Sequence, residues 1–440
     1  MRKGIILAVM LAIIATVAGC AFHGLLPAFL LPGNLLPGGG ETAMPAATTS
    51  PVVTTEPTTA TPATTEDPTP EPTPTTAPAP KPYDTVARYE SAMPEGLTLA
   101  LEYDRYATPL DYFVALKSGK VYEKASVESK KLLSFSAGTR YRVDKSVLGE
   151  DGKSHWYHVL WSDKTGSRSG YVKHSAGQAR SFRLGMLLDR AKKLKDQTDM
   201  GQTVFITNYK DAHGKPPALP GGKEQDAWGY RRSQSAPAYS EASTKSAFRY
   251  APDGLLGHKL EETGGMTKIF FPTFGEAYWV QNKYVSKEDD AIATLMQVVA
   301  VDRLHQNSAV LEYKENGWKL IGLSYVSTGK EGGYSLKTPL GDFMAQGRYK
   351  QFYYYADGTK VIDGHAPWAV RFSGGGYLHG VPSKSSYDEA GKRQDKPAAE
   401  SLRSLGTTPQ SHMCVRNYTS FAKFLYDRFV KGQGAVIVLE

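Results

Sequence analysis

Apolar and polar residues alternate in short runs through much of the chain. Between residues 111 and 175 the runs include FVAL, KVYEKAS, HWYHVLWSD and SGYVKHS, with Gly, Asp and Ser between them. From Met296 onward the runs become longer and more apolar, as in QVVAVD, SAVLEYK and HAPWAVRFSGGGYLHG. A period of two that is broken by turn residues is typical of β-strands. The pattern therefore predicts a mainly β protein.

Two short motifs repeat within the alternating region. KVYEKAS at 120–126 shares Tyr, two residues, Ala and Ser with PAYSEAS at 237–243, and GYV at 170–172 is echoed by KYV at 283–285. This order resembles that of bacterial SH3 domains, in which a Gly-aromatic-Val strand closes a small β-barrel. The resemblance implies two SH3-like modules. Such modules bind wall peptides or glycans, or alternatively only position a neighbouring domain.

Two segments have helical periodicity instead. FRLGMLLDRAKKLKDQ at 182–197 places its apolar residues on one face and predicts an amphipathic connector helix. NYTSFAKFLYDRFVK at 417–431 predicts a second helix, which we expect Thr419 and Ser420 to cap and Gly432 to end. The apolar run AVIVLE then returns the chain to a strand.

The N-terminal segment has the layout of an export signal. Arg2 and Lys3 precede an apolar run from Ile5 to Val17, and small residues follow. The tetrad VAGC, which ends at Cys20, resembles the lipobox of bacterial lipoproteins, where the signal is cut before an acylated Cys. The alternative is an uncleaved signal anchor, because apolar residues continue beyond Cys20. Both interpretations predict an extracytoplasmic protein of the cell envelope that is anchored to the membrane.

A spacer follows the signal. Residues 41–83 are almost entirely Thr, Pro, Ala and Glu, which bury little apolar surface and favour an extended, disordered chain. At ~3 Å per residue it reaches on the order of 100 Å. The patterns divide the chain into a lipoprotein signal peptide at 1–20, a Thr/Pro-rich spacer at 21–83, an SH3-like module at 84–180, a connector with its helix at 181–226, a second SH3-like module at 227–290 and a C-terminal domain at 291–440.

Charge narrows the list of partners only slightly. The formal net charge is +8, from 52 Lys and Arg against 44 Asp and Glu, and the charges are scattered. Basic tracts with interleaved aromatics would indicate nucleic acid, and the sequence has none, so we expect no nucleic-acid partner. The mild positive excess suits an anionic cell wall or membrane surface, and equally an ordinary soluble surface of mixed charge.

The second of the two cysteines carries the candidate chemistry. Cys414 lies in SHMCVRN, just before the second predicted helix, where free backbone N–H groups favour a thiolate and hold an oxyanion. The candidate bases in this domain are His365, His379 and His412. His365 follows a Gly turn and is expected to be structural. The alternatives for Cys414 are a buried structural cysteine and a zinc ligand, but the sequence lacks paired ligand spacing, so we expect no metal.

Four motifs together resemble the catalytic domain of L,D-transpeptidases, which cross-link or edit bacterial peptidoglycan and carry an HG pair followed by an SHGC-type motif. They are YVSTG at 325–329, TPLGDF at 338–343, YLHG at 377–380 and SHMCVR at 411–416. The resemblance covers roughly residues 295–440. It implies a β-rich domain with a helix after the catalytic Cys.

The resemblance also implies roles for individual residues. Cys414 is the nucleophile that takes an acyl group from a tetrapeptide stem and expels its terminal D-alanine. His379 is the base that generates the thiolate, and a backbone carbonyl orients its other ring nitrogen. No cofactor is implied. The residues implied at the substrate or the oxyanion are Ser411, His412, Met413, Arg416 and Gly380.

Two features depart from the family pattern. Met413 occupies a position where the family has Gly, and if that position needs a positive φ, Met is strained by about 1 to 3 kcal/mol. The polar segment 381–410 is longer than in the family and is expected to form an inserted loop or lid.

Three classes of function remain open from the sequence. The leading hypothesis is an envelope-anchored L,D-transpeptidase, acting in peptidoglycan biosynthesis and cell shape, whose partners are stem peptides. With water as the acceptor, the same site gives an L,D-carboxypeptidase or endopeptidase. The others are a peptidoglycan-binding lipoprotein that Met413 has impaired catalytically, and a structural lipoprotein linking membrane to wall.

Overall fold

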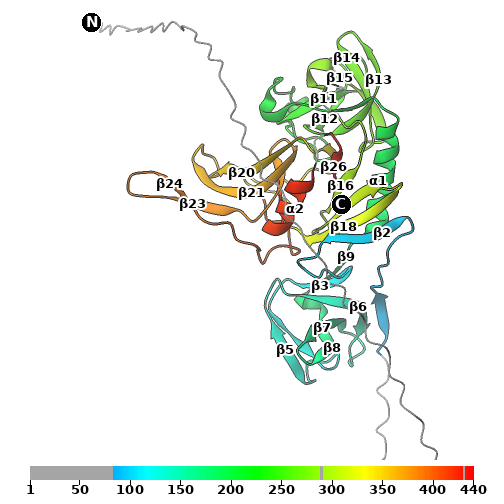
Figure 1. Ribbon diagram of the computed structural model, residues 1–440, viewed down its shortest axis with the longest axis vertical. Helices are drawn as coiled ribbons and strands as arrows, with labels where there is room; N and C mark the ends of the chain where they lie inside the picture. The colour runs from blue at the N-terminus through cyan, green and yellow to red at the C-terminus, as the bar shows by residue number, and fades with distance from the viewer. Residues whose placement is uncertain (1–82, 288–290, 430–431) are drawn as a thin grey trace, which may run out of the picture. The chain divides into compact units, whose positions relative to one another are not determined.

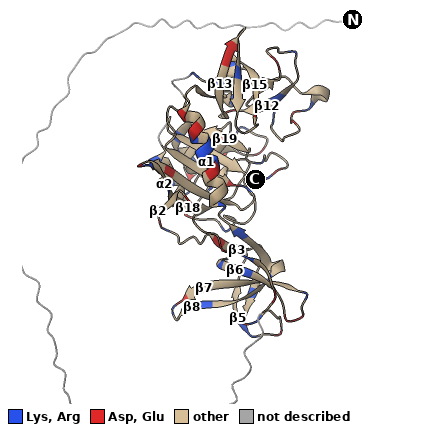
Figure 2. Cartoon of the chain, turned by 90° about the vertical axis from the view of Figure 1, so that its right-hand side faces the viewer, with Lys and Arg blue, Asp and Glu red and all other residues tan. Residues whose placement is uncertain are grey.

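The computed structural model describes residues 83–287, 291–429 and 432–440 (Figure 1). The predicted export signal, the lipidation site Cys20 and nearly all of the predicted spacer lie outside these residues. The described part is mainly β, as predicted, and its strands form four sheets. Within the described ranges, neither α-helix has the length and apolar character to cross a membrane. Lys and Arg are interspersed with Asp and Glu over the described chain (Figure 2).

The first sheet belongs to a module that we call the first β-module, residues 111–181 with the preceding strand β1. Its strands are β1 Thr85–Arg88, β3 Asp111–Ala115, β4 Gly119–Tyr122, β5 Lys131–Phe135, β6 Arg140–Leu148, β7 His155–Asp163, β8 Gly166–Lys173 and β9 Gly177–Ser181. Their order is β5-β4-β8-β7-β6-β3-β9, and β1 pairs with β6. A small core around Phe113, Val159 and Val172 fills the module, because alternate residues of its strands point inward.

The second sheet forms the second β-module, residues 203–285. Its strands are β10 Thr203–Phe205, β11 Ser235–Tyr239, β12 Phe248–Pro252, β13 Leu256–Thr263, β14 Met266–Phe271 and β15 Glu276–Gln281. Their order is β10-β13-β14-β15-β11-β12. Reversed, it corresponds strand for strand to β5-β4-β8-β7-β6-β3 of the first module. The two modules therefore share one topology, while their likeness to SH3 domains stays a prediction.

One of the two sequence echoes marks equivalent positions. KVYEKAS begins in β4 and PAYSEAS in β11, and the same turn follows, since Ser126 N–H donates to Lys124 O and Ser243 N–H donates to Glu241 O. The predicted correspondence between GYV and KYV is wrong. GYV lies in β8, whereas KYV begins inside a 3₁₀ turn, Asn282–Tyr284, that follows β15.

The third sheet is the buried centre of the C-terminal domain. Its strands are β2 Leu97–Tyr103, β16 Gln297–Asp302, β17 Asn307–Lys314, β18 Gly317–Tyr325, β19 Gly341–Met344 and β26 Gly434–Leu439, in the order β19-β26-β16-β17-β18-β2. AVIVLE returns to the sheet as predicted, with β26 parallel to β16. β2 comes from the segment predicted as the first module, yet it pairs in parallel with β18. The segment 84–180 thus contributes strands to two sheets.

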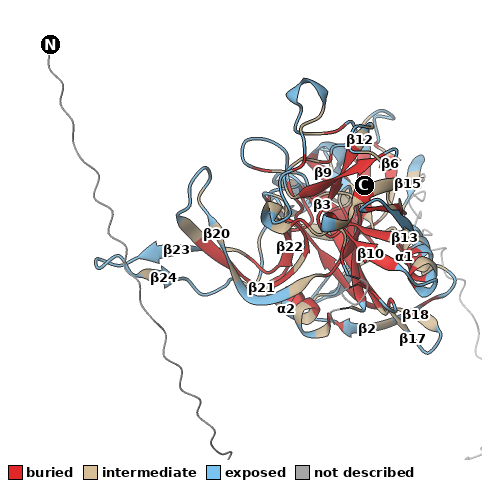
Figure 3. Ribbon diagram, turned by 90° about the horizontal axis from the view of Figure 1, so that it is seen from above, coloured by how far each residue is buried: buried red, intermediate tan, exposed pale blue. Residues whose placement is uncertain are grey.

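The fourth sheet carries the candidate site. Its strands are β20 Gly347–Tyr355, β21 Ile362–Ser373, β22 Gly376–His379, β23 Ser383–Tyr387, β24 Arg393–Asp395 and β25 Val415–Arg416. The order is β24-β23-β21-β22-β25, and β20 pairs with β21. In Figure 3 the inner strands are buried, whereas β23 and β24 extend into solvent.

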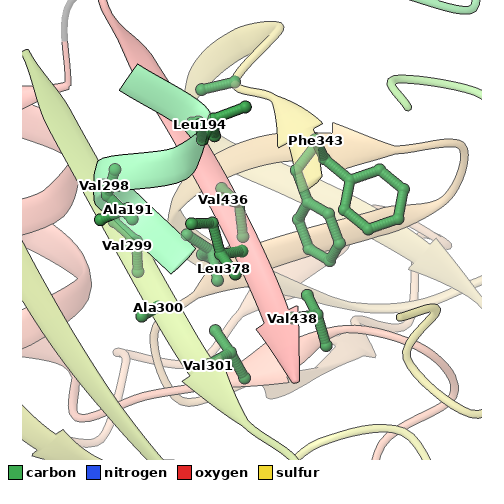
Figure 4. Packing of buried hydrophobic residues seen from close by; sticks show 14 of the residues in the cluster. Ala191, Leu194, Val298, Val299, Ala300, Val301, Phe343, Leu378, Val436 and Val438 are labelled. Carbon is green, nitrogen blue, oxygen red and sulfur yellow. The ribbon is translucent and has the colours of Figure 1, made fainter. Parts of the chain in front are cut away.

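The connector helix α1 spans Leu184–Asp199, close to the predicted 182–197, and packs its apolar face on the third sheet. Figure 4 shows Ala191 of α1 beside Val298 of β16. Each large apolar side chain buried there contributes about 1.5 to 3 kcal/mol to stability. α1 is therefore part of the core of the C-terminal domain.

Helix α2 spans Thr419–Arg428 and is shorter than predicted. Its N-cap residue is Tyr418, and no side chain of its own caps it. Instead, Glu400 binds the first turn: its carbonyl accepts the Thr419 N–H at 2.9 Å and its carboxylate accepts the Ser420 N–H at 3.0 Å. The predicted cap by Thr419 and Ser420 is therefore wrong, because a residue distant in sequence provides the acceptors.

Candidate active site

Two short strands bring the predicted catalytic residues together. β22 and β25 run in parallel, and their register pairs Leu378 with Val415 and His379 with Arg416. Side chains alternate along a strand, and paired residues share a face. Leu378 and Val415 point into the core and are fully buried. Cys414, the residue before Val415, therefore lies on the same face of the sheet as His379.

A cavity of about 810 Å³ opens on this face, and both Cys414 and His379 line it. Its aromatic and charged lining residues include Tyr334, Phe352, Tyr354, Asp357, Asp363, Lys384, His412 and Arg416. The volume lies within the range of ligand-binding pockets, and the lining carries charges of both signs.

The Cys414 thiol is half-buried and neutral at rest. Its Sγ donates to the carbonyl of Gly375 at 3.5 Å. Burial raises the pKa of the thiol to about 11, although the Tyr377 backbone N–H and the positive charge of Arg416 act in the opposite direction. The structure therefore holds a thiol that loses its proton only when a base accepts it.

The expected helix N-terminus does not act on Cys414. Strand β25 lies between Cys414 and α2, and Glu400 already accepts hydrogen bonds from the first turn of that helix. The expectation of a thiolate stabilised by the helix is wrong, because the pKa of the thiol is raised and four residues, 415–418, separate Cys414 from the start of the helix.

His379 has the environment of a neutral base. Its side chain is 3% exposed, and its Nδ1 lies 2.5 Å from Gly380 O, so we assign the ring proton to Nδ1. Burial lowers the pKa of His379 to about 4, opposed by the Gly380 carbonyl and assisted by nearby Arg416. The imidazole is therefore neutral at pH 7, with Nε2 free of a proton.

The loop before Cys414 is held by its own hydrogen bonds. Ser411 Oγ donates to Cys414 O and accepts the Met413 N–H at 3.3 Å. Thr338, the first residue of TPLGDF, donates from Oγ1 to Met413 O at 2.7 Å. His412 lies at the exposed rim of the cavity, and its Nε2 lies 2.9 Å from Asp357 Oδ1 at the tip of the β20–β21 hairpin. Ser411 thus shapes the loop, and His412 connects it to the hairpin.

Met413 does not strain this loop. It is absent from the described non-glycine residues that have a positive φ, so the predicted strain does not arise. Its side chain packs near Gly376 and lines a separate cavity of about 410 Å³. Its N–H is already bound to Ser411, which leaves other backbone groups to hold an oxyanion.

Arg416 and Gly380 occupy distinct positions around the base. The Arg416 side chain lines the cavity, its Nε is buried without a hydrogen-bond partner, and burial lowers its pKa. A guanidinium short of partners is suited to bind a carboxylate. Gly380 instead packs closely, because an added Cβ would lie 2.9 Å from Pro367 Cγ, and its carbonyl orients His379.

The remaining sequence candidates lie away from the sulfur. His365 is on β21, 5% exposed, with Nδ1 3.6 Å from Asp395 Oδ1. Of the segment 381–410, Pro382 and Lys384 line the cavity, whereas most of the remaining residues of the β23–β24 hairpin are exposed. The described ranges hold no group of three or more His, Cys, Asp or Glu placed to bind a metal ion.

Sequence reasoning missed Gly375, Tyr377 and Asp357. Gly375 accepts the thiol and Tyr377 presents its N–H to the sulfur. The three consecutive glycines in SGGGYLHG were the available signal, because such a run indicates a tight turn or a close approach of backbone. Asp357 had no comparable local signal.

Comparison with known proteins gives a family for part of the chain. The family model of the L,D-transpeptidase catalytic domain (YkuD) matches residues 297–438. No curated protein sequence matches the chain.

Among solved structures, an L,D-transpeptidase from Mycobacterium smegmatis is 17% identical over 47% of this chain and 78% of its own, with a TM-score of 0.26. One from Mycobacterium tuberculosis H37Rv is 15% identical over 47% and 76%, with a TM-score of 0.26. One from Stackebrandtia nassauensis is 22% identical over 35% and 60%, with a TM-score of 0.21. The residues that the family model matches, 297–438, contain both Cys414 and His379.

Proposed function

We propose that the protein is a cell-envelope L,D-transpeptidase that forms or edits peptidoglycan cross-links through an acyl-enzyme on Cys414. The register of β22 and β25 carries this proposal, because it places the cysteine and a neutral histidine in one cavity within the segment that matches the family. The donor is a tetrapeptide stem and the acceptor is an amine of a second stem.

The chemistry follows from the two protonation states. As the Cys414 sulfur attacks the carbonyl carbon of the donor, Nε2 of His379 takes the thiol proton. The tetrahedral intermediate collapses by breaking the peptide bond, and His379 returns the proton to the departing D-alanine amine. The acceptor amine then attacks the thioester carbonyl carbon and loses a proton to His379. The C–S bond breaks as the new amide forms, and His379 returns the proton to the departing sulfur, which reforms the thiol.

Two neighbours assist this sequence in the proposal. Arg416 pairs with a stem carboxylate, which its unpartnered Nε favours. The backbone N–H of Cys414 is the oxyanion donor that we assign, because the Met413 N–H is already bound to Ser411.

The test is a reaction of the full chain with a tetrapeptide stem and an acceptor stem, followed by mass spectrometry of the products. We expect a cross-linked product and free D-alanine, and neither with Cys414→Ala. Release of D-alanine without cross-linked product would identify an L,D-carboxypeptidase. No reaction from a folded wild-type chain would favour a peptidoglycan-binding lipoprotein.

We also infer that Cys20 is acylated and that the spacer holds the catalytic domain away from the membrane. The motif VAGC and the Thr/Pro-rich composition support this. The mass of the wild-type chain in the membrane fraction tests it, since a chain that begins at an acylated Cys20 is expected. A membrane-bound chain that keeps residues 1–19 and carries no acyl group would favour the uncleaved signal anchor.

A further inference from the structure

The second β-module reaches the turn that holds the nucleophile. Asp253, in the loop after β12, is 1% exposed, and its carboxylate accepts four hydrogen bonds. One comes from the backbone N–H of Asn208 at 2.8 Å, within the module. The other three come from the C-terminal domain: Arg371 at 2.6 Å, Gln346 at 3.0 Å and the Gly374 N–H at 3.0 Å. Asp253 is therefore a buried anion that joins the module to the β21–β22 turn.

The turn that Asp253 holds is in contact with Cys414. Gly374 is followed by Gly375, whose carbonyl accepts the Cys414 thiol at 3.5 Å. The backbone of the second module also contacts the backbone of β21 directly, because a Cβ added at Gly254 would lie 1.9 Å from Phe372 O. Gly254 has a φ of +85°, which only glycine adopts readily.

A tyrosine of the second module holds the other end of the same turn. The Tyr209 hydroxyl lies 3.0 Å from the Tyr377 hydroxyl, and the Tyr209 ring lies 4.2 Å from the Arg371 guanidinium. Tyr377 presents its backbone N–H to the Cys414 sulfur. The Gly375 carbonyl and the Tyr377 N–H therefore belong to one segment, which we call the 373–377 turn: the β21–β22 turn with the strand residues beside it. The second module contacts this turn near both of its ends.

We propose that Asp253 and Tyr209 are positioning residues of the active site: the second β-module fixes the 373–377 turn, and the turn fixes the Cys414 sulfur for attack. The inference rests on the proposed function for its catalytic consequence. A misplacement of about 1 Å at a reacting atom lowers a rate by about 100-fold, so a loosened turn is sufficient to impair acyl transfer.

A matched control distinguishes positioning from general stability. Asp342 is also fully buried, and Arg190 donates two hydrogen bonds to it at 2.6 and 2.9 Å. Thr273 Oγ1 of the second module accepts the Asp342 N–H at 3.0 Å. Asp342 thus joins the same two parts of the protein, but none of its hydrogen bonds reaches the 373–377 turn.

The experiment uses the full chain with Asp253→Asn, Tyr209→Phe and, as the control, Asp342→Asn. Iodoacetamide labels Cys414 across a range of pH, and the mass of the peptide that contains Cys414 reports the rate. The rate of acylation by a carbapenem is measured on the same samples, together with thermal unfolding.

We expect Asp253→Asn to slow acylation about 10- to 100-fold and to move the alkylation midpoint from the high value of the buried thiol toward that of an ordinary cysteine. Tyr209→Phe should act in the same direction with a smaller effect, and it keeps the inference testable if Asp253→Asn does not fold. Asp342→Asn should lower thermal stability and leave the alkylation profile in place.

An unchanged profile and acylation rate in Asp253→Asn or in Tyr209→Phe would overturn the inference, as would equal shifts in Asp342→Asn. If the carbapenem acylates no variant, including the wild type, while the alkylation profiles still differ as expected, the proposed function fails and the placement of the thiol by the second module stands.

Discussion

The two β-modules have the same strand order, yet they contact different parts of the C-terminal domain. The first module binds the β16–β17 turn, where Tyr112 donates to His305 O at 2.8 Å and Arg180 at 3.2 Å. Arg180 also donates to Gly406 O, in the 381–410 segment, at 2.9 Å. The second module binds the turn beside Cys414 through Asp253 and Tyr209. Topology alone therefore does not assign a role to either module, and the side chains at each contact decide it.

Replacement of His379 should give the largest loss of acyl transfer, and the losses caused by variants of the two modules are compared with it. His379→Gln removes the base that accepts the thiol proton, and general-base catalysis contributes about 100- to 10,000-fold. We expect a loss of acyl transfer in that range in a turnover assay. A loss no greater than that of Asp253→Asn would show that His379 is not the base.

The difference between the two modules is tested by comparing Asp253→Asn, in the second module, with Arg180→Met, in the first. Arg180 is 6% exposed, and it donates to Gln178 Oε1 and to the backbone carbonyls of His305 and Gly406. None of these residues lines the cavity, so the loss of Arg180 should cost about 1 to 3 kcal/mol of stability. We expect thermal unfolding to shift in Arg180→Met while the acylation rate of the folded protein stays within about twofold of wild type. Slowed acylation in Arg180→Met would mean that the first module also acts on the site.

A drop in pH should lower the acylation rate through His379, and it should lower stability through both His379 and His174 of the first module. The pKa of His379 is lowered to about 4, so we expect the acid limb of the acylation rate near pH 4 rather than near 6.5. The free energy of unfolding should fall as the pH drops from about 6.5 toward 4, because the unfolded chain binds the proton first. Burial also lowers the pKa of His174 in the first module.

A variant of His174 separates the contributions of these two histidines to the pH dependence. His174→Gln should remove part of the acid loss of stability without moving the acid limb of the rate. A shift of that limb would contradict the assignment of His379 as the titrating base.

The smallest effect is expected at the N-terminus of α2. Glu400 binds its first turn and lies 3.5 Å from Arg105, in the segment that precedes the first module. Glu400→Gln keeps the shape and removes the charge, which should lower stability by about 0.5 to 1 kcal/mol in denaturant unfolding. A loss of acyl-transfer activity of the same size in free energy would mean that the 381–410 segment also acts on the active site.

Local pattern predicted the elements but not their long-range partners. Alternation and helical spacing identified many of the strands and α1, and the four motifs identified the segment that matches the family. The pairing of β2 with β18 joins residues more than 200 positions apart, and no local signal specifies such a register.

The environment of the site was also beyond local reading. The thiol pKa depends on burial and on Gly375, Tyr377 and Arg416, which only the fold brings around the sulfur. Asp253 carries no local signal, because an acidic residue in a loop is usually exposed and three of its four partners lie in the C-terminal domain.

The most direct test of the central claim is the intact mass of the full chain after exposure to a carbapenem, beside Cys414→Ala. The account predicts a single adduct on the wild type, none on Cys414→Ala, and slower formation in Asp253→Asn. An adduct that persists in Cys414→Ala, or a folded wild type that forms none, would contradict it.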